Sequence, residues 1–359
     1  MNSTINNNDV LQLKITISDD DNTASILETV SHVRPYWNTA KIKFKLLTDG
    51  ITNKLILCSH SYDGKKSMEY LLIRIYGNKT DLLIDRTAEI RNIKLLQAYY
   101  LAPQLYATLE NGLVYEYLPG RTVSPEDVIR PEIYSLIAVE MAKMHKVRSP
   151  DQPKPAASLW AKFQQFVDLI PEEFEDITKQ KQYVELNFSK CQLLQEIRQF
   201  KEAVNDINMA VVFCHNDLLL GNIIYNEARN KVSFIDFEYA CFNYQPFDIG
   251  NHFAEYAGVG NVDYSRYPKK SLQLDWLKYY LMEYKEISKV SEYEIEELYV
   301  QVNKFVLMSH LLWFSWALIQ AEHSYIDFDF IKYAGHRLEE YFKRKSEFLS
   351  MKPSLPSIT

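Results

Sequence analysis

Residues 211–239 read VVFCHNDLLLGNIIYNEARNKVSFIDFEY, and this stretch carries the sharpest pattern in the chain. It opens with an apolar run, Val211–Cys214, that is typical of a buried strand. Two further apolar runs, IIYN and KVSFI, are separated by the polar segment EARN, and this pattern predicts a hairpin. Asp217 follows the first strand closely, and Asp236 follows the last strand directly. The stretch therefore predicts a strand-rich patch that gathers polar side chains in one place.

Asp217, Asn222 and Asp236 have the spacing that phosphoryl transfer requires. One carboxylate must accept or orient the hydroxyl that attacks, while an amide oxygen and a second carboxylate hold Mg²⁺ against the phosphates. Asn222 lies five residues after Asp217, and the hairpin returns Asp236 to the same place. We therefore expect a kinase-like active site with Asp217 as the catalytic base and with Asn222 and Asp236 as metal ligands. We expect His215 to bond backbone near this loop instead of acting as a base.

The chain before this stretch predicts a small antiparallel sheet. The segments LYATL and LVYEY flank Glu110-Asn111-Gly112, and an Asn-Gly pair there favours a hairpin because both residues tolerate positive φ. The other elements expected are strands at Lys41–Leu47, Lys54–Cys58 and Tyr70–Ile75 and helices at Thr23–Val33 and Arg86–Tyr100. We expect a lobe of about five strands over residues 23–117, after a disordered N-terminus over residues 1–22.

Beyond Gly120 the pattern becomes mainly helical. Ser291 followed by Glu294 predicts a capping box, and the segment from 147 to 157 reads as a surface loop. The expected helices are Pro131–Lys146, Leu159–Leu169, Lys190–Asp206, Leu272–Ile287, Glu292 to about Glu322, and one begun by FDIGNHF. The fold class expected is α+β in two lobes, with the larger, mainly helical lobe over residues 118–359.

The composition is that of a globular protein with sizeable cores. The chain has 359 residues, 47% of them hydrophobic, and its formal net charge of -7 disfavours nucleic-acid binding. Four cysteines lie far apart and the N-terminus lacks an apolar signal segment, so we expect free thiols and a cytoplasmic location. The most apolar stretch, FVLMSHLLWFSWALIQ, is broken by Ser309 and His310. It falls short of a bilayer span and predicts a buried helix, so no transmembrane segment is expected.

A kinase-like site also needs a cation on the phosphates of ATP. Arg74 stands in the strand-like run YLLIRIYGN, and Glu89 on the following helix is spaced to pair with it. The turn from Thr48 to Asn53 is expected to cover the triphosphate with backbone N–H groups, with Thr52 and Asn53 at its end. It has one glycine and no GxGxxG pattern, so alone it is not specific. The alternative is that Arg74 and Glu89 are ordinary surface charges.

Several blocks resemble the choline/ethanolamine kinase family, a relative of the protein kinases and the aminoglycoside phosphotransferases. They run from about residue 40 to about residue 345 and are LLTDGITNKL, LLIRIYGNKT, HNDLLLGNIIYN, FIDFEYACFNYQPFDIGNHFAEYAG and VNKFVLMSHLLWFSWALIQAEHSYIDFDFIKYAGHR. Within the family, RIYGNKTDLLIDRTAEI and EYAGVGNVDYSRYP are more similar to ethanolamine kinases than to choline kinases. The resemblance implies a protein-kinase-like fold, phosphorylation of ethanolamine by ATP with Mg²⁺, and the first step toward phosphatidylethanolamine.

The resemblance also implies roles by position. Glu116 and Tyr117 would lie at the hinge beside the adenine. The substrate ammonium would lie near Glu238, Tyr239, Glu255, Trp313, Trp316 and Tyr333. Such a mixture is chemically coherent, because aromatic faces attract an ammonium and carboxylates complete its site. A homodimer is a further state that the family leaves open.

The amine substrate is where the residues leave alternatives open. Ala257-Gly258-Val259-Gly260 stands where choline kinases have an aromatic-rich loop, and small residues there favour a primary ammonium, which needs acceptors, over a quaternary one. Pockets discriminate added methyl groups by only about 1–3 kcal/mol each, so choline kinase or dual specificity is the nearest alternative. An aminoglycoside-type kinase and a non-catalytic pseudokinase scaffold are more distant ones. Trp313 and Trp316 also fit plain core packing, and Glu255 also fits an organising role behind the substrate.

Overall fold

The computed structural model describes residues 10–18, 22–47, 53–62, 68–77, 80–324 and 326–354. Its contacts divide the chain into two compact units. Unit 1 comprises Met1–Ile84 and Ile93–Pro119, and unit 2 comprises Asp85–Asn92 and Gly120–Thr359. Helix α2 (Arg86–Ala98) contributes its first turns to unit 2 and the remainder to unit 1.

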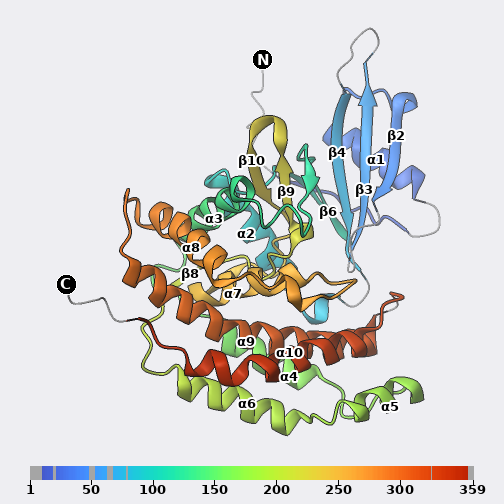
Figure 1. Cartoon of the computed structure of the whole chain (residues 1–359). Coiled ribbons are helices and arrows are strands. Elements are labelled where there is room, and N and C mark those ends of the chain that lie inside the picture. The colour runs from blue at the N-terminus through green and yellow to red at the C-terminus, as the bar shows by residue number, and fades with distance from the viewer. Residues whose placement is uncertain are drawn as a thin grey trace. The chain divides into compact units, whose positions relative to one another are not determined.

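Unit 1 is built on a six-stranded sheet with the order β1-β5-β6-β4-β3-β2. Strands β4, β3 and β2 of this sheet lie side by side in Figure 1. The strands that match the predicted ones are β2 (Ile42–Leu47), β3 (Lys54–Ser61), β4 (Met68–Ile75), β5 (Leu105–Leu109) and β6 (Gly112–Glu116). Helix α1 (Thr23–Val33) has the predicted bounds. Its Ile26 and Val30 pack in one apolar cluster with Ile56, Cys58 and Ile73 of the sheet. Burial of each such side chain contributes about 1.5–3 kcal/mol, and this cluster stabilises the unit.

The segment before α1 lies along the sheet, so the expectation of disorder over residues 1–22 is wrong for the part that the structure describes. Strand β1 (Leu11–Gln12) pairs in parallel with β5, and Leu13 N donates to Thr108 O at 2.9 Å. Ile17 is 1% exposed and belongs to the apolar cluster. Burial of Ile15 and Ile17, together with the backbone hydrogen bonds of this segment to β5 and to the turn that follows it, is the physical reason for the order, because these contacts jointly offset the loss of chain entropy. Residues 1–9 and 19–21 lie outside the described residues.

The predicted β5–β6 hairpin is confirmed, but its turn differs in detail. Leu109 pairs with Gly112, so Glu110 and Asn111 form the two-residue turn, and neither residue has a positive φ. The side chain of Asn111 instead holds the N-terminal segment: its Oδ1 accepts from Ile17 N at 3.0 Å, and its Nδ2 donates to Ile17 O at 2.9 Å. Gly112 is required for close approach, because a Cβ there would lie 2.2 Å from the carbonyl oxygen of Arg74.

Unit 2 is mainly helical, as predicted. The predicted helices appear as α3 (Pro131–His145), α4 (Leu159–Leu169), α6 (Lys190–Ala203), α7 (Gln245–Ala254), α8 (Lys270–Lys285) and α9 (Glu292–His323). Two helices were not predicted from the sequence, α5 (Ile177–Glu185) and α10 (Phe330–Ser350). In α10 the buried residues recur at helical spacing, but many charged residues between them obscure that signal.

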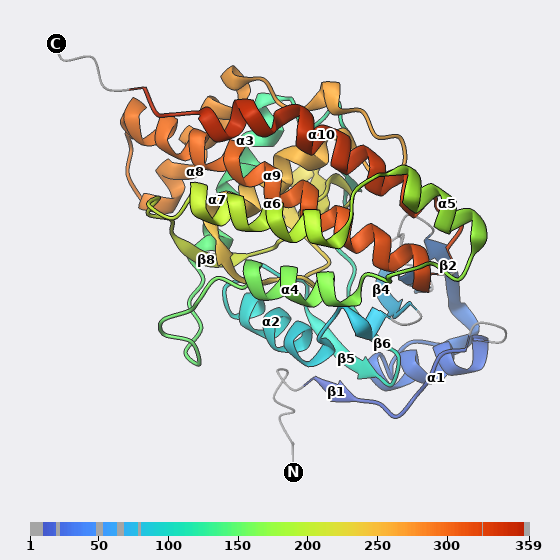
Figure 2. The same cartoon turned by 90° about the horizontal axis from the view of Figure 1, so that it is seen from below.

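Helix α9 is the centre of unit 2 and packs against α7 and α10 (Figure 2). By length and composition α9 can span a membrane, contrary to expectation, but 94% of its most apolar window is buried inside the protein, which confirms the predicted buried helix. The predicted capping box of Ser291 and Glu294 begins the helix. Gly250 lets α7 approach α9 closely, because a Cβ there would lie 2.9 Å from the carbonyl oxygen of Val302.

Short strands in unit 2 carry residues 211–239, the segment with the predicted catalytic residues. Strand β8 (Val211–Cys214) pairs antiparallel with β11 (Cys241–Tyr244). The predicted hairpin is confirmed as β9 (Ile223–Asn226) and β10 (Lys231–Phe234), joined through Asn230, which has a φ of 44°. The short strand β7 (Arg121–Thr122) pairs with β9 and was not predicted. All four cysteines are free, as expected.

Candidate active site

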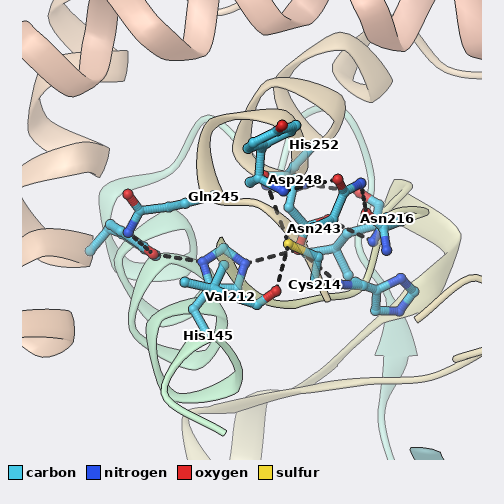
Figure 3. Close-up of polar contacts among 12 residues, drawn as sticks. His145, Val212, Cys214, Asn216, Asn243, Gln245, Asp248 and His252 are labelled. Carbon is cyan, nitrogen blue, oxygen red and sulfur yellow. Dashed lines mark hydrogen bonds and ion pairs between the residues drawn. The ribbon is translucent and has the colours of Figure 1, made fainter. Parts of the chain in front are cut away.

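The segment between β8 and β9 carries Asp217 and is held by Asp248 of α7 (Figure 3). The carboxylate of Asp248 accepts hydrogen bonds from the backbone N–H of His215 at 2.8 Å and of Asn216 at 2.7 Å. Asn216 has a φ of 64°, and Asp248 is fully buried. Asp248 therefore fixes this loop by charge-assisted hydrogen bonds to its backbone, the kind of bond that is shorter and stronger than a neutral one.

Asp248 is itself held by His145, which the sequence analysis did not single out. His145 Nε2 lies 2.9 Å from Asp248 Oδ2, and its Nδ1 lies 2.6 Å from Tyr280 Oη. Burial raises the pKa of Asp248, but hydrogen bonds from His145 and from the backbone of His215 bring it below its ordinary value. Asp248 is thus an ionised acceptor at neutral pH. His145 lies on α3, far away in sequence, and no local pattern identifies it.

His215 and Asn216 connect the loop to the segment that follows β10. The imidazole of His215 donates from Nε2 to Ile235 O at 3.0 Å, and burial lowers its pKa, so it is a neutral structural group, as expected. Asn216 Nδ2 donates to Tyr239 O at 2.9 Å, while its Oδ1 accepts from Asn243 Nδ2 at 2.7 Å. These bonds set the loop against residues 235–243.

The structure brings Asp217, Asn222 and Asp236 together. Asn222 Nδ2 donates to Asp217 O at 2.8 Å, and its backbone oxygen accepts from Ile235 N at 3.0 Å. Because the amide nitrogen makes the side-chain bond, the amide oxygen is the atom left to face a cation. Asp236 has a φ of 65°, a left-handed conformation that Asp tolerates better than most residues. The predicted base and the two predicted ligands therefore share one site.

Negative charge is concentrated around Asp217. Burial raises its pKa well above the ordinary value, and the charges of Glu255, Asp236 and Glu238 add to that effect, while Arg337 opposes it. Ligand atoms of Glu89, Asp236 and Glu238 all lie within 4.8 Å of one another. Carboxylate and amide oxygens are the donors that Mg²⁺ prefers, so the residues present fit this ion.

Arg86 lies between two of these acids and was missed by the sequence analysis. Its Nη1 is 2.9 Å from Glu89 Oε2 and 3.1 Å from Glu238 Oε2. Glu89 is therefore buried beside a cation of its own helix, in the part of α2 that belongs to unit 2. Arg74 belongs to unit 1, and its pairing with Glu89 stays a prediction.

Of the residues predicted to bind ATP from unit 1, Arg74 and Glu116 lie on strands of its sheet, and Asn53 and Tyr117 stand next to strand ends. Arg74 is on β4, 5% exposed, and its guanidinium lies 5.7 Å from the centre of the Tyr76 ring. Asn53 Oδ1 accepts from Gly77 N at 3.3 Å, while Thr52 lies outside the described residues. At the end of β6, Glu116 accepts from Gln104 N at 3.1 Å and the Tyr117 ring lies 5.0 Å from the ring of Tyr70. Their roles toward ATP remain predictions.

Six rings of unit 2 form a continuous aromatic cluster. The ring-to-ring distances are 5.4 Å for Tyr239–Trp313, 5.5 Å for Trp313–Trp316, 5.7 Å for Trp316–Phe330, 4.9 Å for Phe328–Phe330 and 5.7 Å for Phe328–Tyr333. Trp316 Nε1 donates to Tyr239 Oη at 3.0 Å. Burial raises the pKa of Tyr239, and the charges of Glu238 and Asp217 raise it further. This end of the cluster therefore lies beside the acidic site.

Glu255 forms a buried ion pair that was not predicted from the sequence. Its carboxylate accepts from Arg337 of α10, and both side chains are 2% exposed. Arg337 Nε also donates to Tyr333 Oη at 3.0 Å. This geometry favours an organising role for Glu255, the alternative that the sequence had left open. Arg337 itself was missed because α10 was not predicted.

Comparisons with known proteins agree with this architecture. Residues 44–342 match the family model described as Choline/ethanolamine kinase. The chain is 44% identical to Ethanolamine kinase 1 of Mus musculus over 96% of both chains, and 43% identical to Ethanolamine kinase of Drosophila melanogaster over 90% of this chain and 77% of that one. The solved structure of an ethanolamine kinase from Plasmodium vivax is 28% identical, covers 91% of this chain and 90% of its own, and has a TM-score of 0.78.

These matches confirm the α+β, protein-kinase-like fold expected from the sequence. A choline kinase structure from Cryptosporidium parvum, 23% identical over 91% of this chain and 96% of its own, shares the fold with a TM-score of 0.73. The sheet, antiparallel except for the β1–β5 pair, lies in the N-terminal part, and the C-terminal part is mainly helical. The chain belongs to the choline/ethanolamine kinase family.

Proposed function

We propose that this protein phosphorylates the hydroxyl group of ethanolamine with ATP, forming phosphoethanolamine for phosphatidylethanolamine synthesis. The observation that carries the proposal is the buried acidic centre of Asp217, Asn222 and Asp236 beside the aromatic cluster. Relatives named ethanolamine kinases, similar along nearly the whole chain, support the same activity.

In this proposal Asp217 accepts the proton of the substrate hydroxyl. The hydrogen bonds from the backbone of His215 and Asn216 to Asp248 fix the position of Asp217. The base is therefore held in place for the attacking oxygen of the substrate. Oxygens of Asn222 and Asp236 would hold Mg²⁺, which neutralises charge on the β- and γ-phosphates when it is bound. Glu238 and Glu89 lie beside Asp236 and add to the same oxygen-rich centre.

The aromatic cluster is proposed to receive the ammonium group. Tyr239, Trp313, Trp316 and Tyr333 supply ring faces, and an ammonium over such a face gains about 0.5–2 kcal/mol. Glu255 already bonds Arg337, so its contribution to binding is to position the Tyr333 side of the cluster. Glu238 is the other proposed carboxylate near the amine.

We further propose that residues 23–117 bind ATP and that residues 118–359 carry catalysis and amine recognition. Arg74 would contact phosphate and pair with Glu89, Thr52 and Asn53 would border the triphosphate, and Glu116 with Tyr117 would contact the adenine. A cytoplasmic location is proposed as expected from the sequence, whereas a homodimer is a state that the family leaves open. Sedimentation of the purified protein tests the homodimer.

The test is an assay of the purified protein with ATP, Mg²⁺ and either ethanolamine or choline. We expect turnover with both ATP and ethanolamine present and a higher kcat/KM for ethanolamine than for choline. A clear preference for choline would instead favour the alternative, a choline kinase, and would overturn the argument from the Ala257–Gly260 loop. An absence of turnover with both amines would refute the kinase proposal and favour a non-catalytic pseudokinase scaffold.

A further inference from the structure

Asn251 of α7 is buried completely and holds a tryptophan of the aromatic cluster. Its Oδ1 accepts from Trp313 Nε1 at 2.7 Å and from Ser309 Oγ at 2.7 Å. An indole N–H can only donate, so the bond to Trp313 fixes which end of the amide faces α9. The Nδ2 atom then points away, and it has no hydrogen-bond partner among the residues that the structure describes.

That unpartnered nitrogen is informative. A buried donor without an acceptor costs about 1–3 kcal/mol, which an apolar side chain of similar size avoids. Packing alone therefore gives no reason for an amide at position 251. The two short bonds to Oδ1 supply a reason for the amide, since the bond from Trp313 holds that ring in a single orientation and the bond from Ser309 helps to fix the amide.

The two tryptophans of the cluster are anchored in different ways. Trp316 Nε1 bonds Tyr239 Oη, within the cluster, whereas Trp313 Nε1 bonds Asn251, outside it. The Trp313 ring meets Tyr239 edge-on, at an interplanar angle of 77°. Asn251 thus sets the angle of the ring that lies between Tyr239 and Trp316.

We infer that Asn251 is a positioning residue for amine recognition, acting through Trp313; this rests on the proposed function. A cation gains from a ring only when it lies over the face, within about 6 Å of the ring centre. Releasing the Nε1 anchor lets the ring turn and weakens that contact. In the proposed function other residues bind ATP, so the KM for ATP is expected not to depend on this ring.

The test is a double-mutant cycle of Asn251→Leu and Trp313→Phe, read as KM for ethanolamine, KM for ATP and kcat. Asn251→Leu should raise the KM for ethanolamine by about 2- to 30-fold, the span of one cation–π contact, and change the KM for ATP by less than about 2-fold. In the Trp313→Phe background, which has no indole N–H, the same change should have less than about 2-fold effect.

Asn303→Leu is the matched control, because it removes another buried asparagine of unit 2, 1% exposed and bonded to Tyr267 Oη at 2.7 Å. It should lower stability without changing the KM for ethanolamine. If Asn251→Leu does not fold, Asn251→Asp keeps an acceptor for Trp313 and should leave that KM at or below the wild-type value. A raised KM in Asn251→Asp would contradict the inference.

Two results separate this inference from the proposed function. Wild-type protein that turns over choline but not ethanolamine refutes the proposed substrate, and the cycle is then read with choline. The inference alone is refuted if the wild-type protein is active and Asn251→Leu leaves the KM for the amine unchanged. It is also refuted if Asn251→Leu raises that KM by the same factor in the Trp313→Phe background as in the wild type.

Discussion

Asp248→Asn tests how firmly the segment that carries Asp217 is held. The two oxygens of Asp248 accept from three donors: His215 N at 2.8 Å, Asn216 N at 2.7 Å and His145 Nε2 at 2.9 Å. Asparagine offers one acceptor oxygen in place of two. Whichever way the amide turns, at least one backbone N–H then faces an NH₂ group.

The less damaging orientation keeps the oxygen toward His215 and His145 and leaves the N–H of Asn216 opposed. An unpaired buried donor costs about 1–3 kcal/mol, and loss of the charge weakens the two bonds that remain. We expect the free energy of unfolding to fall by about 2–5 kcal/mol. We also expect kcat to fall at least about 10-fold, because catalysis depends on the placement of Asp217.

The pH dependence of this difference has a definite sign. Burial raises the pKa of Asp248, but bonds from His145 and the loop backbone hold it below its ordinary value. A carboxyl group with a lowered folded-state pKa stabilises the fold above its unfolded pKa, about 3.9, and loses this contribution as the pH falls through the folded value. The stability gap between wild type and Asp248→Asn should therefore be full at neutral pH and shrink below about pH 4.

The assay is urea unfolding followed by circular dichroism, together with kcat at saturating substrates. Asp275→Asn is a matched control, because Asp275 accepts one bond, from Tyr134 Oη at 2.6 Å, which an amide oxygen can also accept. It should change both readouts little. If Asp248→Asn unfolded at the wild-type urea concentration with wild-type kcat, these hydrogen bonds would not be what holds the loop.

Four further substitutions, in three tests, probe the site and its support. Asp217→Asn should lower kcat by about 10²–10⁴ without lowering the urea midpoint, since it removes one of several clustered carboxylates; unchanged kcat would remove Asp217 as the base. Arg337→Met should lower the free energy of unfolding by about 3–5 kcal/mol by leaving Glu255 buried and uncompensated, and Glu255→Gln in the same chain should restore part of it; equal stabilities would refute the pairing. Gly250→Ala should destabilise by about 1–3 kcal/mol in the same unfolding assay, because its Cβ would lie 2.9 Å from Val302 O, and a neutral result would contradict the close packing.

The parts of the site that the sequence predicted are those whose geometry is local. Asp217, Asn222 and Asp236 stand on one loop and one hairpin, so their spacing along the chain limits where they meet. The strands and the caps of long helices were readable for the same reason, since period and cap residues act over a few positions. Substrate residues on α9 were placed by family resemblance, not by pattern.

The missed residues are partners fixed by tertiary contact. His145, Arg86 and Arg337 are single polar residues on helices. Each pairs with an acid that is distant in the sequence and comes near only in the folded chain. Nothing in the local sequence distinguishes such a residue from a surface charge. Order at Ile17 was missed likewise, because its burial depends on the sheet that it joins.

Two left-handed residues show how the site constrains its own sequence. Asn216 has a φ of 64° and Asp236 a φ of 65°, one directly before Asp217 and the other at the end of the hairpin. A non-glycine residue held there costs about 1–3 kcal/mol unless its surroundings over-determine it, and Asn and Asp are the types that bear it best. For Asn216 the surroundings are bonds to Asp248, Tyr239 O and Asn243. The residue types at both positions therefore answer two demands at once, a backbone that turns sharply and a polar side chain that faces the catalytic centre or its support. An alanine at position 216 would neither adopt the left-handed backbone easily nor supply the polar side chain. Because the same residue types meet both demands, one short stretch of sequence predicts the loop and the chemistry beside it together.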